Sequence, residues 1–323
     1  MSFSYEELAE IRHYIHQHPE LSGQEYQTTA FLKERLEELG IRILESGLKT
    51  GLIAEIGSGQ PVVALRADID ALPILEQTNL PYQSQNPGVM HACGHDFHQT
   101  SLLGAAALLK EKEDQLDGTV RLIFQPAEEI SEGATEVLAT GLLEDVQGII
   151  GFHNMPQLKA GQLALNAGAM MAGVEKFKVT VTGVSSHAAR PDLGADTVTA
   201  VTTMVQNLQL LISRTVSPFE TAVLSITHLD VGSTWNVLPK SGYFEGTIRS
   251  FNPSLQRELK ERFISIIRHT AKSLEVDVTF EWGMTPPVTF NDEELTQLVW
   301  DTSQGLAEVI PAHPSTAGED FAF

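Results

Sequence analysis

The sequence has little of what marks secreted, membrane-spanning or nucleic-acid-binding proteins. Its single cysteine cannot form an internal disulfide, no run of eighteen apolar residues occurs, and the start M-S-F-S-Y-E-E lacks the basic and apolar segments of a signal peptide. Basic residues are scarce, since 21 Lys and Arg face 42 Asp and Glu and leave a formal charge of −21. Such a charge repels nucleic acid and anionic membrane surfaces. We therefore expect a cytoplasmic protein that binds neither nucleic acid nor a membrane.

The sequence does contain enough apolar material for a sizeable core. Its 323 residues are 42% hydrophobic, which suits about two globular domains. Near-continuous apolar runs at 61–67, 119–125 and 148–153 alternate with helical patterns, among them 101–110. This alternation is typical of an α/β domain whose parallel strands are buried on both faces. A capping box at Ser4 predicts an earlier helix.

The pattern changes after Gly173. Strands and amphipathic helices follow in the order βαββαβ, which is that of the split βαβ, ferredoxin-like unit. The unit has the character of an insertion, because Pro286-Pro287 marks an exit and a new helical segment starts near Asp292. We expect an α/β domain from residues 1–173 and 288–323, and an insert from residues 174–287.

Polar side chains follow each of the three apolar runs. The first run leads into Asp68 and Asp70, the second into Glu128 and Glu129, and the third into His153. In open α/β sheets, ligands bind in the crevice at the carboxyl ends of the strands. These groups can therefore converge.

The stretch M-H-A-C-G-H-D-F-H-Q-T, residues 90–100, places three histidines, an aspartate and the only cysteine just before a helical pattern. We expect a loop, Cys93-Gly94-His95-Asp96, that enters this helix and closes the same crevice. Zinc accepts sulfur, nitrogen and oxygen ligands, whereas manganese favours carboxylate and imidazole. The donor set therefore predicts a divalent transition metal better than calcium or magnesium.

Each of these residues also has an ordinary structural explanation. Cys93 could be a buried inert thiol or a reactive one, and the aspartates could cap the turns that follow their strand. The two glutamates could be a solvated pair on a loop, and His153 could be a core histidine with satisfied hydrogen bonds. A metal site is favoured because four separate segments would otherwise place metal-binding chemistry at one sheet edge by coincidence.

Short motifs follow one another along nearly the whole chain: His16-x-His18-Pro-Glu20-Leu, Arg66-Ala-Asp68-Ile-Asp70-Ala-Leu-Pro73, Met90-His-Ala-Cys93-Gly-His95-Asp96, Phe124-Gln-Pro-Ala-Glu128-Glu129, His153-Asn154-Met155-Pro156, Ser186-His187-Ala-Ala, Asn236-Val-Leu-Pro239, Gly246-Thr-Ile-Arg249 and Gly318-Glu-Asp-Phe321. Together they resemble the metal-dependent aminoacylase and carboxypeptidase family. The likeness is greatest to the amidohydrolase branch that includes hippurate hydrolase, N-acetyl-diaminopimelate deacetylase and the plant auxin-conjugate (IAA-amino acid) hydrolases.

The resemblance implies a zinc-peptidase-like catalytic domain with a central mixed, largely parallel sheet. It also implies an inserted ferredoxin-like domain that serves as lid and dimer contact, and hence a homodimer. The full-length protein would hold two divalent metal ions per subunit, manganese or zinc, with cobalt or nickel as alternatives. The implied reaction cleaves the amide bond of a small N-acyl-amino acid by metal-activated water, and N-acetyl derivatives are the first candidates for the substrate. A dipeptidase or carboxypeptidase, or an inactive metal-poor binding module, are the competing interpretations.

The resemblance also implies roles for single residues of the α/β domain. Glu128 would be the general base, and Asp70 would orient the metal site from behind. Asp68 stands where other branches have a histidine ligand, so the ligand set is rearranged here. The implied metal ligands are Cys93, near the bridging position, with His95, Glu129 and His153.

Three residues of the insert would meet the substrate. His187 would reach into the neighbouring subunit and polarise the scissile carbonyl, although a loop histidine is its ordinary explanation. Asn236 and Arg249 would bind the substrate carboxylate, which suits a guanidinium fork, although Arg249 could instead form a strand-end ion pair.

One departure from the family lies after the E-D-F motif. The family continues beyond it and supplies a last histidine ligand there, whereas this sequence stops at Phe323, and His313 precedes the motif. We therefore expect this chain to bind metal weakly, with fewer than two ions per subunit, and to have little amidase activity.

Overall fold

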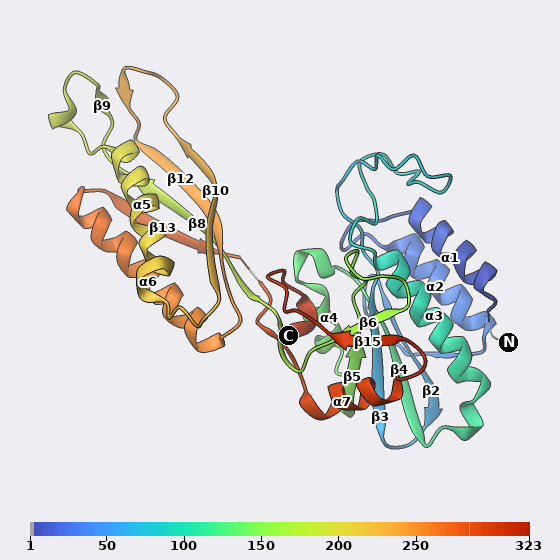
Figure 1. Cartoon of the computed structure of the whole chain (residues 1–323). Helices are drawn as coiled ribbons and strands as arrows, with labels where there is room; N and C mark the ends of the chain where they lie inside the picture. Colours follow the sequence, from blue (N-terminus) through green and yellow to red (C-terminus); the bar gives the residue numbers. More distant parts are fainter. Residues whose placement is uncertain (1–2, 284) are drawn as a thin grey trace. The chain divides into compact units, whose positions relative to one another are not determined.

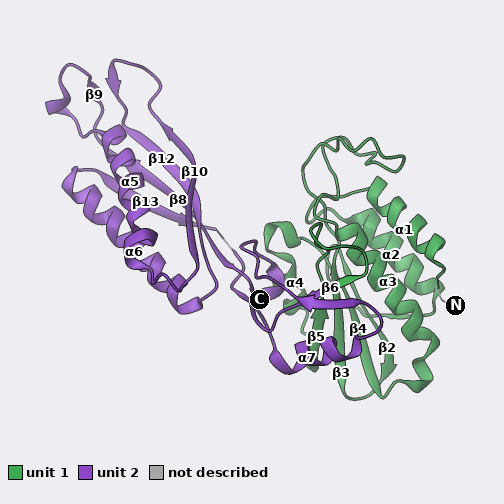
Figure 2. Ribbon diagram, viewed as in Figure 1, with its two compact units in different colours: residues 1–162, 323 green, residues 163–322 purple. Residues whose placement is uncertain are grey.

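The computed structural model describes residues 3–283 and 285–323 (Figure 1). Contacts within this described part of the chain group it into two compact units, residues 1–162 with Phe323 and residues 163–322 (Figure 2). The predicted insert, 174–287, falls within the second unit. None of the described helices is both long enough and apolar enough to span a membrane.

The first unit is built on a mixed sheet with the strand order β1-β2-β4-β3-β5. Its strands are β1 (Arg42–Ile43), β2 (Leu52–Ser58), β3 (Val62–Asp68), β4 (Gly118–Gln125) and β5 (Val146–Gly151). The predicted strands are β3, β4 and β5, and β3 pairs in parallel with both of the others. β4 is buried along its whole length, as its continuous apolar run indicates.

The expectation of a largely parallel sheet is wrong. β2 pairs antiparallel with β4, and β1 with β2, so the two kinds of pairing are equal in number among the described residues. β2 is not among the strands predicted from the sequence. Only residues 59–61 separate β2 from β3, and so short a link reverses the chain, whereas a parallel connection needs a long crossover. Because β4 runs parallel to β3 and lies between them, β2 must run antiparallel to β4.

Helices cover both faces of this sheet (Figure 1). They are α1 (Tyr5–Gln17), α2 (Tyr26–Glu38), α3 (His95–Glu111) and α4 (Gly133–Ala139), with the 3₁₀ turns η1 (Glu113–Gln115) and η2 (Glu128–Ile130). The predicted capping box at Ser4 opens α1. α1, α2 and α3 pack on one face around Leu36, Leu103 and Phe124, and α4 covers the other through Val137.

Helix α3 begins earlier than expected. The segment Cys93-Gly94-His95-Asp96 was expected to be a loop, but the helix already starts at His95. Gly94 is its N-cap, with a left-handed φ of +96°, and a Cβ there would lie 2.2 Å from Oδ1 of Asn154. Only glycine therefore fits this turn, which brings the chain into the helix directly at His95.

The second unit contains an antiparallel sheet with the strand order β10-β12-β8-β13. Its elements follow in the expected βαββαβ order: β8 (Gly173–Thr182), α5 (Thr197–Thr215), β10 (Ala222–Val231), β12 (Ser241–Ser250), α6 (Pro253–Ser273) and β13 (Asp277–Trp282). Both helices pack on this sheet around Phe177, Phe244 and Phe263. The helix expected near Asp292 is α7 (Glu293–Thr302), with Asp292 as its N-cap.

Short ribbons and 3₁₀ turns lie between these elements. β9 (Ser186–His187) pairs with β11 (Val237–Leu238), β7 (Gly168–Met171) with β14 (Thr289–Asn291), and β6 (Gln162–Leu165) with β15 (Glu308–Pro311); η3 (Pro191–Leu193) and η4 (Asp320–Ala322) are 3₁₀ turns. β9 follows β8, and β11 precedes β12. Because Thr182 pairs with Ser241, the β9–β11 ribbon lies beyond that end of the sheet (Figure 1).

Candidate metal centre

The candidate site lies where three parallel strands of the first unit end. β3 leads into the two aspartates, β4 into η2 with its two glutamates, and β5 into His153, while the start of α3 brings Cys93 and His95. The ligand atoms of Cys93, His95 and His153 lie within 4.8 Å of one another, and so do those of His95, Glu128 and Glu129. The structure therefore brings the predicted ligands and the predicted base together.

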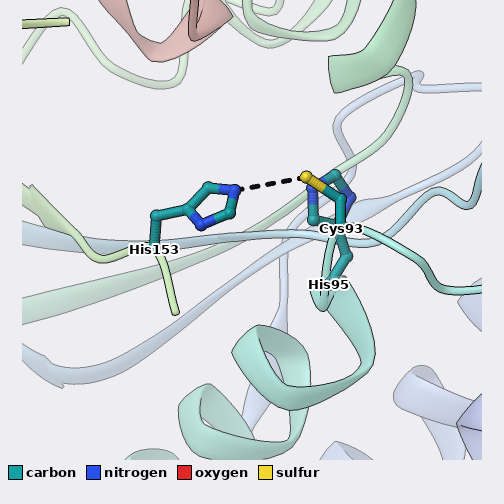
Figure 3. A group of neighbouring side chains, drawn as sticks. All are labelled: Cys93, His95 and His153. Carbon is teal, nitrogen blue, oxygen red and sulfur yellow. Dashed lines mark hydrogen bonds between the residues drawn. The ribbon is translucent and has the colours of Figure 1, made fainter. Parts of the chain in front are cut away.

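Cys93 and His153 point their donor atoms at each other (Figure 3). The Cys93 sulfur lies 3.3 Å from Nε2 of His153. Nδ1 of His153 lies 2.8 Å from the carbonyl oxygen of Asn154 and donates its proton there. In the neutral ring, Nε2 is then unprotonated, and its lone pair can coordinate a metal. Sulfur and nitrogen face one point, as two ligands of a single ion do.

His95 is fully buried, and its two ring nitrogens are in different situations. Nδ1 lies 2.9 Å from the carbonyl oxygen and 3.2 Å from Oδ1 of Asp70, to which it donates. Nε2 has no hydrogen-bond partner among the described residues. It lies 3.6, 3.8 and 4.0 Å from carboxylate oxygens of Asp68, Glu129 and Glu128. A buried nitrogen without a partner costs free energy, and a cation at this point would satisfy it.

Asp70 links His95 to the turn that carries Glu129. One oxygen faces His95, and Oδ2 accepts from the backbone N–H of Glu129 at 3.0 Å and from the Ser22 hydroxyl at 2.6 Å. Oε1 of Glu129 is buried and has no hydrogen-bond partner within the described chain. A carboxylate behind a histidine is how proteins commonly orient a metal-binding imidazole. Asp70 therefore has the contacts of an orienting residue.

The charges of the site set up a competition between protons and a cation. Burial lowers the pKa of His95, but Asp68 and Asp70 outweigh it and hold the pKa well above its ordinary value. Burial raises the pKa of the Cys93 thiol and of the Glu129 carboxyl. Each of these groups thus keeps its proton to a higher pH than in free solution, and a metal must displace it.

Asp68 has both oxygens engaged by other side chains. Oδ2 accepts from Arg66 at 2.7 Å and Oδ1 from Nδ1 of His98 at 2.6 Å. Although burial opposes it, the positive charges of Arg66 and His95 lower the pKa of Asp68. Nε2 of His98 accepts from the Asn154 N–H at 2.9 Å. His98 is not among the site residues predicted from the sequence, although its position one helical turn after His95 was an available signal.

The predicted substrate residues all lie in the second unit. His187 is exposed on β9, and the carbonyl oxygen of Asn236 accepts from the Ala188 N–H at 3.0 Å, so His187 and Asn236 share the β9–β11 ribbon. Arg249 is near the other end of β12, about 25 Å from that ribbon at the rise of a strand. Its Nη1 donates to the carbonyl oxygen of Thr316 at 2.7 Å. A single chain therefore does not bring Arg249 to the other two residues.

The residues present fit a divalent transition metal. Two groups of donor atoms share His95, one with Cys93 and His153 and one with Glu128 and Glu129. Nε2 of His95 and Oε1 of Glu129 are buried, 3.8 Å apart, and neither has a hydrogen-bond partner in the described residues. Sulfur and nitrogen ligands suit zinc and cobalt, whereas calcium and magnesium prefer all-oxygen sets.

Comparison with known families identifies the family of this chain. The family model described as Peptidase family M20/M25/M40 matches residues 64–323. The chain belongs to this family. It shares the M20 peptidase-like α/β fold with a mixed sheet. As a member, it is a hydrolase that acts on amide bonds.

Relatives of this M20 chain lie in the branch that the motifs indicated. N-acetyl-L-cysteine deacetylase of Bacillus subtilis is 46% identical over 98% of this chain and 77% of its own length. An IAA-amino acid hydrolase (ILR1-like 5) of Arabidopsis thaliana is 39% identical over 97% of this chain and 74% of its own length. The fold also matches the crystal structure of the Bacillus subtilis YXEP protein, a dinuclear metal binding peptidase of the M20 family. The TM-score is 0.86, with 40% identity over 98% of this chain and 84% of that protein. The predicted family and branch are thus confirmed.

Proposed function

We propose that this M20 chain is a metal-dependent amidohydrolase that releases a free amino acid from a small N-acyl-amino acid, N-acetyl derivatives first among them. The observation that carries the proposal is the buried Nε2 of His95, which has no hydrogen-bond partner in the described residues and lies among Cys93, Glu129 and His153. Two relatives act on N-acetyl-L-cysteine and on IAA-amino acids, which supports the substrate class.

In the proposal, Cys93, His95, Glu129 and His153 hold a divalent ion. Zinc or manganese is proposed first, with cobalt or nickel as alternatives. Because the YXEP protein is dinuclear, two ions per subunit are proposed for the full-length protein. Once bound, the metal would activate the attacking water by lowering its pKa and would supply Lewis acidity toward the scissile carbonyl. Asp70 keeps the His95 ring in its ligand orientation through the Nδ1 contact.

Glu128 is the proposed general base. It adjoins Glu129 on the same turn, and its Oε2 lies 4.0 Å from Nε2 of His95. The Glu128 carboxylate takes a proton from the attacking water as the new C–O bond forms. It returns that proton to the leaving nitrogen as the C–N bond breaks, so the products are the acyl carboxylate and the free amino acid.

His187, Asn236 and Arg249 are the proposed substrate-binding residues. Nδ1 of His187 accepts from the Ala189 N–H at 3.1 Å. The proton of the neutral ring is then on Nε2, where it can be donated to the carbonyl oxygen of a substrate. Because Arg249 is remote from the ribbon in its own chain, we propose that His187 and Asn236 serve the site of a partner subunit in a homodimer formed by the insert, residues 174–287.

A substrate screen on metal-depleted protein tests the function. Zinc, manganese, cobalt or nickel is added back, and release of free amino acid is followed for N-acetyl-amino acids and, in parallel, for dipeptides. We expect metal-dependent turnover of N-acetyl-amino acids above that of dipeptides. Preference for dipeptides would favour the peptidase alternative, and metal binding without turnover of either class would favour the inactive binding module.

A further inference from the structure

The turn that carries Glu128 and Glu129 has an uncommon backbone. Ala127 precedes η2 with φ +52° and ψ +37°, and Ser131 follows it with φ +59°. Both are left-handed conformations that residues with a Cβ rarely adopt. Such residues persist where the surrounding structure holds them, and they occur often at functional sites.

Glu25 contacts Ala127 from a distant part of the sequence. Its Oε1 accepts from the Ala127 N–H at 2.8 Å, and its Oε2 accepts from the Thr50 hydroxyl at 2.7 Å. Glu25 is 0% exposed. Next to Thr50, a Cβ on Gly51 would lie 2.6 Å from Cδ of Pro126, so this loop packs closely against the end of β4. The Glu25 carboxylate thus links the loop at Thr50 to the turn at Ala127.

Helix capping does not explain the position of Glu25. It is the N-cap residue of α2 but makes no side-chain hydrogen bond to that helix. Glu20 does the capping instead, because its carboxylate accepts from the N–H groups of Gln27 and Thr28 at 3.1 and 2.8 Å. Burial raises the pKa of Glu25, the mark of a carboxyl group that is costly to bury. The interaction that its carboxylate makes is the hydrogen bond to the turn at Ala127.

We propose that Glu25 is a positioning residue of the metal site: by accepting the Ala127 N–H it fixes the left-handed turn that aims Glu129 at the metal and Glu128 at the substrate water. Asp70 holds the same turn further along, through the Glu129 N–H. The inference rests on the proposed function for the roles of Glu128 and Glu129. Residues behind metal ligands commonly change metal affinity when they are lost, which makes the idea measurable.

The test compares Zn²⁺ affinity, measured by calorimetry against a competing chelator, across variants of the full chain. Glu25→Ala should weaken Zn²⁺ binding by about 10- to 100-fold. Glu25→Gln should stay near wild type, because its carbonyl oxygen can still accept from Ala127 and its amide can donate to Thr50. The decisive variant is Glu25→Ala with Ala127→Gly, since glycine adopts the left-handed conformation without help. This double variant should recover most of the lost affinity.

Glu20→Ala is the matched control, because it removes a glutamate of the same segment that caps α2. It should lower the melting temperature and leave Zn²⁺ affinity unchanged. If Glu25→Ala does not fold, Glu25→Asp, which is one methylene shorter, replaces it and should show the same loss and the same rescue by Ala127→Gly. Unchanged Zn²⁺ affinity in the folded Glu25 variant, or no recovery of affinity on adding Ala127→Gly, would overturn this inference but not the proposed function. A wild-type chain that binds no Zn²⁺ would overturn the proposed function, and the inference with it.

Discussion

The two groups of predicted functional residues sit in very different surroundings. In the first unit, His95 and Glu129 are held by Asp70, and His153 is held by the Asn154 carbonyl. In the second unit, His187 is an exposed residue on a two-residue strand. Donors fixed and desolvated in this way suit a metal ion, whereas an exposed ribbon suits a residue that meets a substrate or another chain. Changes in the first group should therefore alter metal affinity, and changes in the second should alter turnover alone.

The largest expected effect belongs to Glu128, which lies in the first unit but should behave as a catalytic group. Glu128→Gln should lower kcat by about 10² to 10⁴, because a proton-transfer group is lost. Metal affinity should stay near wild type, because the proposed ligands remain. The matched control is Glu132→Gln, at an exposed glutamate four residues on, which should leave kcat unchanged. Retention of more than about a tenth of the activity by Glu128→Gln would remove Glu128 from the role of base.

The next largest effect should separate the second unit from the first. His187→Ala should lower kcat by about 10² to 10³, the usual loss for an oxyanion donor, with metal affinity unchanged. His269→Ala, at another exposed histidine of the same unit, is the control.

Subunit mixing decides in which chain His187 acts. Mixing inactive His187→Ala and Glu128→Gln proteins should restore part of the activity, because one site of the mixed dimer carries both intact residues. No recovery after verified subunit exchange would show that His187 does not serve a partner.

A smaller effect is expected when Asp70, which orients the proposed metal ligands, is replaced. Asp70 accepts from His95, from the Glu129 N–H and from Ser22, and an asparagine offers only one acceptor oxygen in its place. Asp70→Asn should therefore weaken Zn²⁺ binding by about 10- to 100-fold. Asp145→Asn, at the surface partner of Arg121, serves as the control and should leave Zn²⁺ binding intact. Equal affinity in the two variants would contradict the orienting role.

Metal binding should also depend on pH, an effect that needs no substitution. The pKa values of His95, Cys93 and Glu129 are all raised, so each group holds its proton to higher pH, and a metal must displace it. Affinity should therefore rise with pH and fall on acidification, by about tenfold per pH unit for each proton displaced. Calorimetry in two buffers of different ionisation enthalpy measures the protons released. Binding that is independent of pH would contradict the assignment of these ligands.

Much of the fold was predictable because it depends on local patterns. The apolar runs predicted β3, β4 and β5, and alternation predicted the βαββαβ order of the second unit. The antiparallel half of the first sheet was not predictable in the same way. Glu55 interrupts the apolar pattern of β2, and it is tolerated because Arg121 on β4 pairs with it at 3.0 Å. That partner is known only once the strands are placed.

The proximity of the ligand candidates was predictable because strand ends of a parallel sheet meet at one edge. The groups that hold them were not. Glu25 contacts Ala127 across 102 residues of sequence, and Ser22 contacts Asp70 across 48. A contact between a side chain and a distant segment leaves no local spacing or periodicity. The family motifs contain Glu20 and Asp70 but gave no reason to choose Glu25.

The convergence of Cys93, His95, Glu129 and His153 on one metal ion is the central claim, and cobalt substitution tests it most directly. Co²⁺ is added to metal-depleted protein, and the absorption spectrum is recorded for the wild type and for Cys93→Ser. Because Cys93 is the only cysteine of the chain, any thiolate-to-cobalt charge-transfer band must come from it. The account predicts such a band in the wild type and its loss in Cys93→Ser. Cobalt bound without that band would contradict the account, because the thiol would then lie outside the metal site.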